Sequence, residues 1–325
     1  RADLHDPDTV YVALDNHKYG DFSPYLLVSK NRGRSWKMIT DGIPEKHLVW
    51  RLVQDHIRPD LMFAATEFGV FATFDAGAAW HKLSGGMPTI SLRDIQIQRR
   101  ENDLVAASFG RGFYVLDDHS ALRDINPEDF EVDAALFKPR DADWYFPKRP
   151  LGYRPKGSQG DSLFVADNPA FGAVFTYYLS TSLETREQAR QTSEAEALES
   201  GKSVSFPGWD TVTEESREEE PEVMLTIKDL EGNVLRRVPA VNQSGLNRVA
   251  WDLRRSFEGP VEMGNNWRGD PPTGFMVMPG TYTAQLIALH NGQERVLTAL
   301  MPNFQVWLRC RPPTSITITG LFCAL

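Results

Sequence analysis

The sequence predicts an all-β protein in which part of a β-propeller is followed by a small antiparallel β-sandwich. Three observations carry this prediction. Short strand-like segments separated by turn signals fill the first 120 residues. An eight-residue pattern occurs at 29–36 and again at 73–80. A second strand-rich region runs from 171 to 289 and is interrupted by an acidic, helix-forming segment at 184–222.

The first region consists of repeated units of similar sequence. The two tryptophans that close the repeated pattern, Trp36 and Trp80, lie 44 residues apart. A period of about 40–50 residues with about four strands in each unit is typical of a β-propeller. Strands are expected at 9–15, 24–30, 35–40, 49–55, 61–67, 69–75, 80–84, 93–98, 103–109 and 112–118. Because these units make too few blades to close a ring, we expect further blades before Arg1.

The repeated pattern reads "SKNRGRSW" in its first copy and "TFDAGAAW" in its second. Its glycine permits a positive φ in a tight hairpin turn. Its Asn or Asp can accept hydrogen bonds from turn amides, and its Trp can bury a large area against its own blade. We therefore predict a structural rather than a catalytic role for the eight positions Ser29, Asn31, Gly33, Trp36, Thr73, Asp75, Gly77 and Trp80.

The predicted domains are blades over 1–125, a linker over 126–160 and a sandwich over 161–303. The linker is rich in proline and glycine, which favour irregular structure. Sandwich strands are expected at 171–180, 222–238, 245–253 and 279–289, with a hairpin turn at Glu231-Gly232. The insertion at 184–222 begins with a predicted helix over 184–202 and is expected to be a solvated, mobile segment.

Composition and charge exclude several classes of protein. The net charge is −9, and the insertion alone holds twelve acids and four bases, so the rest of the chain is close to neutral. This balance argues against a nucleic-acid partner. No apolar run approaches the roughly 18 residues of a membrane span. The two cysteines, Cys310 and Cys323, form no disulfide framework or metal pattern, and no cofactor or metal is predicted.

Taken together, the repeated motifs resemble the Asp boxes of BNR-repeat propellers, which occur in sialidases, xyloglucanases and sortilin. Residues 47–118 resemble more closely a group of large bacterial proteins that are labelled glycosyl hydrolase or sortilin-like. "AVFTYYL", "GLNRVAWDLR" and "MPGTYTAQL" resemble their C-terminal immunoglobulin-like sandwich of the FlgD type. The resemblance implies a periplasmic or extracellular bacterial protein whose propeller binds carbohydrate or polypeptide.

Successive turns of a propeller blade alternate between its two faces, so the Asp boxes leave the opposite face for a ligand. The candidate residues on that face are Asp15, His17, Lys18, Asp21, Glu67, Arg93 and Arg111, with Glu45 and His47 near a crossing between blades. Carboxylates beside an Arg suit glycoside hydrolysis and equally suit binding of a glycan or peptide. The alternative is that these side chains only cap turns and pair with neighbouring charges. The remaining histidines show no ligand spacing and are expected at ordinary surface or partly buried positions.

Three functions remain open at this stage. The first is a binding protein for carbohydrate or polypeptide. The second is a secreted glycoside hydrolase, sialidase-like or xyloglucanase-like, whose catalytic residues lie partly in the expected further blades. The third is a structural or assembly module. Asn31 replaces the usual Asp of the box, and neither the sialidase nor the xyloglucanase catalytic set can be assembled from these blades alone.

The last residues depart from the pattern before them. From Arg295 to Leu325 there is no Asp or Glu, and both cysteines fall in this stretch. We predict an aberrant or unstructured tail over 304–325, with the reading frame lost near Phe304–Leu308. The alternative is a genuine last strand, "TSITITGLFCAL", that pairs with the edge of the sandwich.

Overall fold

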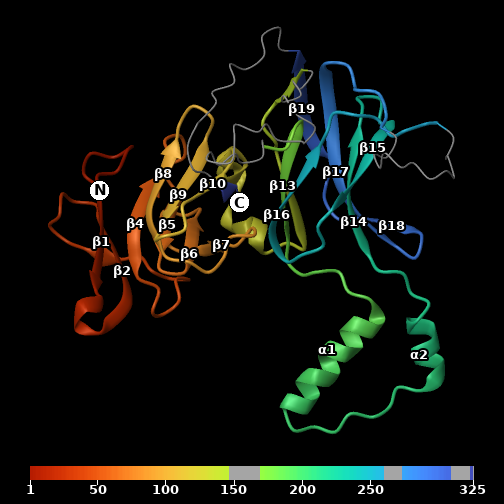
Figure 1. Cartoon of the computed structure of the whole chain (residues 1–325), viewed down its shortest axis with the longest axis horizontal. Helices are drawn as coiled ribbons and strands as arrows, with labels where there is room; N and C mark the ends of the chain where they lie inside the picture. Colours follow the sequence, from red (N-terminus) through yellow and green to blue (C-terminus); the bar gives the residue numbers. More distant parts are fainter. Residues whose placement is uncertain (146–168, 260–272, 309–322, 325) are drawn as a thin grey trace, which may run out of the picture. The chain divides into compact units, whose positions relative to one another are not determined.

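The computed structural model describes residues 1–145, 169–259, 273–308 and 323–324. It confirms the all-β prediction (Figure 1). The chain divides into two compact units. The blade unit contains Arg1–Glu128, and the sandwich unit contains Asp129–Trp144 and the described residues between Phe171 and Leu308.

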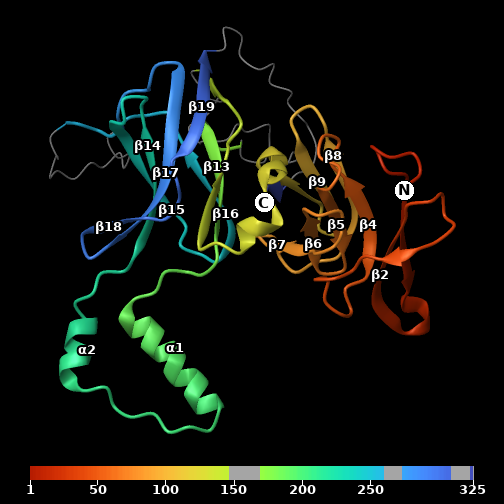
Figure 2. The same ribbon diagram turned by 180° about the vertical axis from the view of Figure 1, so that it is seen from behind.

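The blade unit contains three sheets that follow one another along the chain (Figures 1 and 2). The first sheet is β1 (Val10–Asn16), β2 (Asp21–Ser29) and β3 (Lys37–Met38). The second is β4 (Val49–Gln54), β5 (Met62–Thr66), β6 (Gly69–Thr73) and β7 (His81–Leu83). The third is β8 (Leu92–Gln98), β9 (Asp103–Ser108) and β10 (Phe113–Leu116), with β20 (Cys323–Ala324) parallel to β10. The second sheet therefore has the four-stranded form of a propeller blade.

Apolar side chains between neighbouring sheets form the core of the blade unit. Every residue of β5 and β6 is buried, because the second sheet is covered by the first on one face and by the third on the other. The cluster between the first two sheets includes Leu26, Ile39, Leu52, Phe71 and Trp80. Burial of such side chains stabilises the fold by about 1.5–3 kcal/mol each, so the contact between blades contributes to the stability of the unit.

The second Asp box is a tight turn held by two side chains. The Asp75 carboxylate oxygen Oδ1 accepts hydrogen bonds from the amides of Ala78 (2.8 Å) and Ala79 (3.0 Å). The Thr73 hydroxyl donates to the same oxygen at 2.7 Å and accepts from the Gly77 amide at 2.9 Å. Gly77 has a φ of +91°, and a Cβ there would lie 2.9 Å from the Ile39 side chain. The backbone angle therefore favours glycine, and a side chain there would also crowd Ile39.

The first Asp box makes the same turn with Asn31 in place of Asp. Its Oδ1 accepts from the Ser35 amide at 2.9 Å and from the Ser29 hydroxyl at 3.0 Å. Because the amide also carries donors, Asn31 Nδ2 donates to the Ser35 hydroxyl at 2.8 Å. The Gly33 amide donates to the Ser29 hydroxyl at 2.8 Å, as in the second box. Asn therefore preserves the turn.

The two box tryptophans differ in burial. Trp80 is 3% exposed, and its indole Nε1 donates to the Ile39 carbonyl at 2.9 Å, so it fastens the second blade to the first. The expectation that each Trp packs on its own blade missed this link between blades. Trp36, at the same position of the first box, is 44% exposed.

Replacing Asp75 by alanine removes the acceptor of two turn amides. We expect the free energy of unfolding of the chain to fall by about 0.5–2 kcal/mol, as for the loss of a side-chain cap on backbone amides. Urea unfolding measures this as a lower midpoint with an unchanged slope. Asp41→Ala is the control, because that exposed side chain makes no hydrogen bond among the described residues. A loss of ligand affinity in folded Asp75→Ala would contradict the structural role.

The sandwich unit packs a three-stranded sheet on a six-stranded sheet. The first sheet has the order β11 (Ala134–Phe137), β13 (Ala173–Leu179), β16 (Gly245–Trp251). The second has the order β12 (Ala142–Trp144), β19 (Met301–Leu308), β17 (Gly280–His290), β14 (Glu222–Lys228), β15 (Val234–Ala240), and β18 (Gln293–Val296) also pairs with β17. Edge-to-face aromatic pairs such as Phe175–Phe304 at 5.1 Å and Trp251–Tyr282 at 5.5 Å lie in its core.

Two expected boundaries are wrong. The stretch 126–160 was expected to be a linker, yet β11 and β12 lie within it and pair with β13 and β19. The tail was expected to begin at 304, yet β19 continues to Leu308, and Phe304 and Val306 point into the core. Both errors arise because pairing with distant strands overrides local sequence preference. Residues 309–322 and 325 lie outside the described residues.

The insertion between β13 and β14 consists of α1 (Arg186–Glu199), α2 (Trp209–Glu215) and their connecting loop, and we call it the helical hairpin (Figure 2). Thr185 and Gln188 form a capping box at the start of α1, in which the Thr185 hydroxyl accepts from the Gln188 amide at 3.2 Å. Short 3-10 helices are η1 (His17–Tyr19), η2 (His119–Asp124) and η3 (Pro127–Phe130). No helix in the described part of the chain is long and apolar enough to cross a membrane.

Candidate functional site

The candidate site lies at one end of the three blades, opposite the Asp boxes. In the second and third blades the first strand begins where the second strand ends, as in the pairs Val49–Thr66 and Leu92–Ser108. The β5–β6 turn, the start of β4 and the start of β8 are therefore neighbours at this end. The Asp boxes follow β2 and β6 and lie at the other end of the strands.

Trp50 lies at the centre of the side chains that meet at this end of the strands. It is the second residue of β4 and is partly exposed. Its indole Nε1 donates to Glu67 Oε2 at 2.7 Å, and the Ser91 hydroxyl donates to the same oxygen at 3.0 Å. No described residue donates to Glu67 Oε1. The carboxylate is therefore held by one oxygen and presents the other.

Arg93 comes to Trp50 from the next blade. Its guanidinium Cζ lies 3.7 Å from the centre of the Trp50 ring and 5.0 Å from that of Phe109. Its Nη2 is 3.9 Å from Glu67 Oε2, a loose ion pair. Contact with two aromatic rings holds an Arg by cation–π attraction while its in-plane N–H groups stay available. The N–H groups of Arg93 therefore lie beside the Glu67 carboxylate, whose Oε1 accepts no hydrogen bond from a described residue.

His17 comes to Trp50 from the preceding blade. Its ring meets that of Trp50 edge to face, with centres 5.6 Å apart. Its Nδ1 is bonded to an Asp15 carboxylate oxygen. The enlarged loop that holds both residues therefore reaches the second blade, and three blades contribute side chains around one indole ring.

The other candidate residues do not join this cluster. The Asp21 carboxylate accepts from the Tyr25 hydroxyl at 2.6 Å and the Ser23 amide at 3.0 Å, and these bonds lower the pKa of Asp21 to about 2. Asp21 therefore fixes its own turn. Lys18 and Arg111 are exposed and form no ion pair with any described residue.

The two residues named near the crossing between blades also lie beside the cluster rather than in it. His47 packs edge-on against Phe68 at 5.0 Å and Phe71 at 5.7 Å between ring centres. Its Nδ1 is 3.3 Å from the Glu45 carbonyl, and the Glu45 side chain is exposed. His47 thus supports the β5–β6 turn that carries Glu67.

Sequence reasoning missed Trp50, Ser91 and Phe109. Trp50 directly follows the crossing at 45–49, and Phe109 directly precedes the Gly110–Gly112 turn, so both occupy strand ends on the expected face. An aromatic residue at a strand end on this face was the sequence signal that could have identified Trp50 and Phe109. We call Trp50, Glu67, Ser91, Arg93 and Phe109, with His17, the Trp50 cluster.

The cluster offers an aromatic surface, an open carboxylate oxygen and guanidinium donors on one exposed face. A sugar ring presents apolar C–H groups on its face and hydroxyl groups at its edge. Aromatic rings pack against the first, while carboxylates and Arg bond the second. No group of three or more metal-ligating side chains occurs among the described residues.

A second polar cluster lies at the other end of β4, around the buried side chains of Asp55 and His119. Asp55 is 0% exposed, and its Oδ2 accepts from His119 Nε2 and Arg123 Nη2, both at 2.8 Å. Its Oδ1 accepts from Arg123 Nε at 3.0 Å and from the amides of Ile57 and Arg58 at 2.8 and 2.7 Å. Burial alone would raise the pKa of Asp55, but these hydrogen bonds outweigh it and hold that pKa far below its usual range.

This buried cluster is structural. It joins the end of β4 in the second blade to η2 after the third blade. His119 is 0% exposed, so the expectation of a surface or partly buried histidine is wrong for it. Asp55 and His119 have no exposed surface, and both oxygens of Asp55 already accept hydrogen bonds, so we assign no ligand to this cluster.

No protein-family model and no curated protein matches this chain. Among solved structures, the chain resembles an ancestral GH74 enzyme with a TM-score of 0.30, 11% identity and coverage of 91% of this chain and 34% of the enzyme. It also resembles the extracellular domain of a one-component system from B. thetaiotaomicron, with a TM-score of 0.22, 12% identity and coverage of 87% and 28%. The chain spans about a third of the length of these structures, and at these scores neither match supports an inference about its function.

Proposed function

We propose that the blade unit binds carbohydrate at the Trp50 cluster. The observation that carries this proposal is the meeting of three blades at one partly exposed tryptophan, with an open carboxylate oxygen and an Arg beside it. A structural role alone does not require Phe109, which is 69% exposed, to lie over the Arg93 guanidinium.

Each group has a distinct part in the proposed binding. The exposed ring surface of Trp50 and Phe109 packs against the apolar face of a sugar. Glu67 Oε1 accepts from a sugar hydroxyl, and Arg93 donates to a neighbouring hydroxyl oxygen. Because the carboxylate and guanidinium are already held by Trp50, Ser91 and Phe109, little side-chain freedom is lost on binding. A protein with this role belongs in the periplasm or outside the cell.

Glycan-array screening of the chain, followed by titration calorimetry with the best oligosaccharide, tests the proposal. We expect Trp50→Ala to weaken binding by about tenfold or more, the range for a central aromatic in an interface. Glu67→Gln keeps the shape of the side chain and tests its charge, and we expect a smaller loss.

Trp36→Ala is the matched control, because Trp36 is also a partly exposed tryptophan but lies at the Asp-box end. Its binding should equal that of the unmodified chain. If no glycan binds, or if Trp36→Ala and Trp50→Ala lose affinity equally, the proposal is wrong. Far-UV circular dichroism of each variant separates lost binding from lost fold.

The hydrolase and assembly-module alternatives predict different results in the same experiments. A hydrolase would turn over a glycoside and lose that turnover in Glu67→Gln, since a glycosidase depends on two carboxyl groups about 5–10 Å apart. An assembly module would bind a protein partner through the sandwich unit, and no oligosaccharide would bind to the chain.

A further inference from the structure

The helical hairpin is an insertion that buries almost nothing. No residue of α1 is buried, and α2 buries only Glu215. A helix of this length is marginal in water unless an apolar face is packed or side-chain pairs support it. The hairpin must therefore be held together by its polar contacts.

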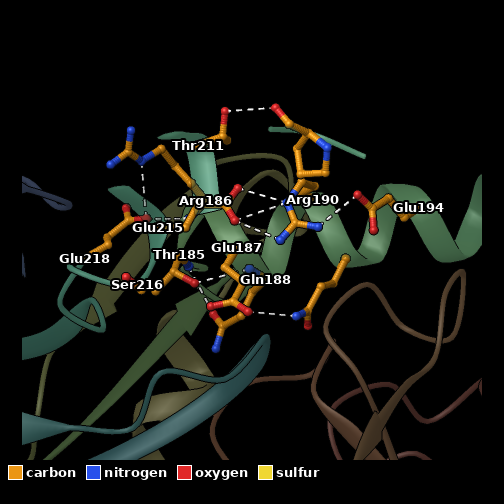
Figure 3. Close-up of polar contacts among 12 residues, drawn as sticks. Thr185, Arg186, Glu187, Gln188, Arg190, Glu194, Thr211, Glu215, Ser216 and Glu218 are labelled. Carbon is orange, nitrogen blue, oxygen red and sulfur yellow. Dashed lines mark hydrogen bonds and ion pairs between the residues drawn. The ribbon is translucent and has the colours of Figure 1, made fainter. Parts of the chain in front are cut away.

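Ion pairs join the two helices (Figure 3). Arg190 Nη2 lies 2.8 Å from Glu215 Oε2, and its Nη1 lies 2.9 Å from Glu194 within α1. Arg186 lies 3.3 Å from Glu218 and 3.6 Å from Glu214. These contacts fix the spacing of the helices but use only half of the four basic residues in 184–222.

The hairpin carries a large excess of unpaired acid. Of the twelve acidic residues in 184–222, four are in these ion pairs, which leaves eight acids and two bases, Lys202 and Arg217, that form no ion pair with any described residue. Glu196, Glu199 and Asp210 are among the acids that form no ion pair with any described residue. They lie at the end of α1 and the start of α2, beside the connecting loop.

Apolar side chains are exposed at the same place. Trp209 is 77% exposed and Phe206 is 61% exposed, and their rings meet edge to face with centres 5.1 Å apart. Leu198, at the end of α1, is 63% exposed. Val204, Phe206, Pro207 and Val212 line a hollow of about 300 Å³ together with Arg190 and Glu194.

We propose that this tip of the hairpin, defined by Leu198, Val204, Phe206 and Trp209 with Glu196, Glu199 and Asp210, binds a basic polypeptide segment. The excess negative charge selects lysine and arginine and repels anionic surfaces such as acidic membranes. The exposed aromatic pair supplies the apolar anchor that carries most of the energy in protein interfaces. The partner segment therefore combines basic residues with apolar ones. This inference is independent of the carbohydrate site on the blades.

Fluorescence anisotropy with the full chain tests the proposal. The probe is a short fluorescein-labelled peptide in which lysines alternate with leucine and tryptophan. One control peptide carries glutamate in place of lysine, and another carries serine in place of the apolar residues. We expect binding of the first peptide only, weakening as the salt concentration rises from about 0.05 to 0.5 M.

Two sets of variants locate the binding. Phe206→Ala with Trp209→Ala should weaken it by about tenfold or more. Glu196→Gln, Glu199→Gln and Asp210→Asn together should weaken it and reduce its salt dependence. Phe275→Ala is the matched control, because Phe275 is an 89% exposed aromatic of the same unit outside the hairpin. All these side chains are exposed, and circular dichroism checks that the helices remain.

Hydrogen exchange gives a second readout. The α1 amides should exchange fast in the free chain and more slowly with the lysine-containing peptide bound. The proposal is overturned if this peptide does not bind, if the hairpin variants bind it as well as Phe275→Ala does, or if Trp209→Ala instead dissociates a dimer of the chain.

Discussion

Replacing Asp55 by alanine is expected to lower the free energy of unfolding of the chain by about 3–5 kcal/mol. The substitution removes the shared acceptor of His119 and Arg123 and of two backbone amides, and it leaves a fully buried imidazole without its carboxylate. It also cuts the link between β4 and η2. Urea unfolding followed by tryptophan fluorescence measures the change in midpoint.

Asp94→Ala is the control for this experiment. Asp94 pairs with Arg51 at 3.2 Å, but both side chains are about half exposed, at 51% and 49%. A solvent-exposed pair contributes about 0–1 kcal/mol, so the control should change little. If the two substitutions cost the same, the buried cluster does not stabilise the fold as described.

The same cluster sets a pH dependence. Because hydrogen bonds hold the pKa of folded Asp55 below its unfolded value of about 3.9, its contribution to stability is complete above that pH. The contribution is lost as pH falls below about 4 toward the folded pKa. The stability difference between the unmodified chain and Asp55→Ala should therefore shrink as the pH falls below about 4.

Trp80→Ala is expected to lower the free energy of unfolding by a similar amount, about 3–5 kcal/mol. The substitution leaves a cavity between two blades and removes the bond from the indole to Ile39. Trp36→Ala should cost much less, because Trp36 lies at the same motif position but is 44% exposed. If urea unfolding shows the same loss of stability for both variants, the position in the motif, and not packing between blades, determines that loss.

Local patterns in the sequence were enough to predict the blades. The Gly and the Asp or Asn of each box fix a turn through bonds within eight residues, so their geometry follows from the sequence. Alternation of turns then places His17, Glu67 and Arg93 at one end of the strands. The structure brings these three together at Trp50.

Contacts between distant residues were not predictable in this way. Asp55 meets His119 and Arg123 across more than 60 positions, and no local spacing indicates such a pair. Strands β11 and β12 lie in a proline-rich stretch and exist because β13 and β19 supply their hydrogen bonds. Trp50 belongs to a strand of ordinary appearance, and its role arises from neighbours in two other blades.

Hydrogen exchange of the chain with and without the oligosaccharide found by array is the most direct test of the carbohydrate site. Binding at the Trp50 cluster predicts slower exchange at 48–50, in the β5–β6 turn at 66–69 and at 91–93, where the cluster's backbone lies. It predicts no change in the Asp-box turns at 29–36 and 73–80. Protection confined to the Asp-box turns or to the sandwich unit would contradict the proposed site.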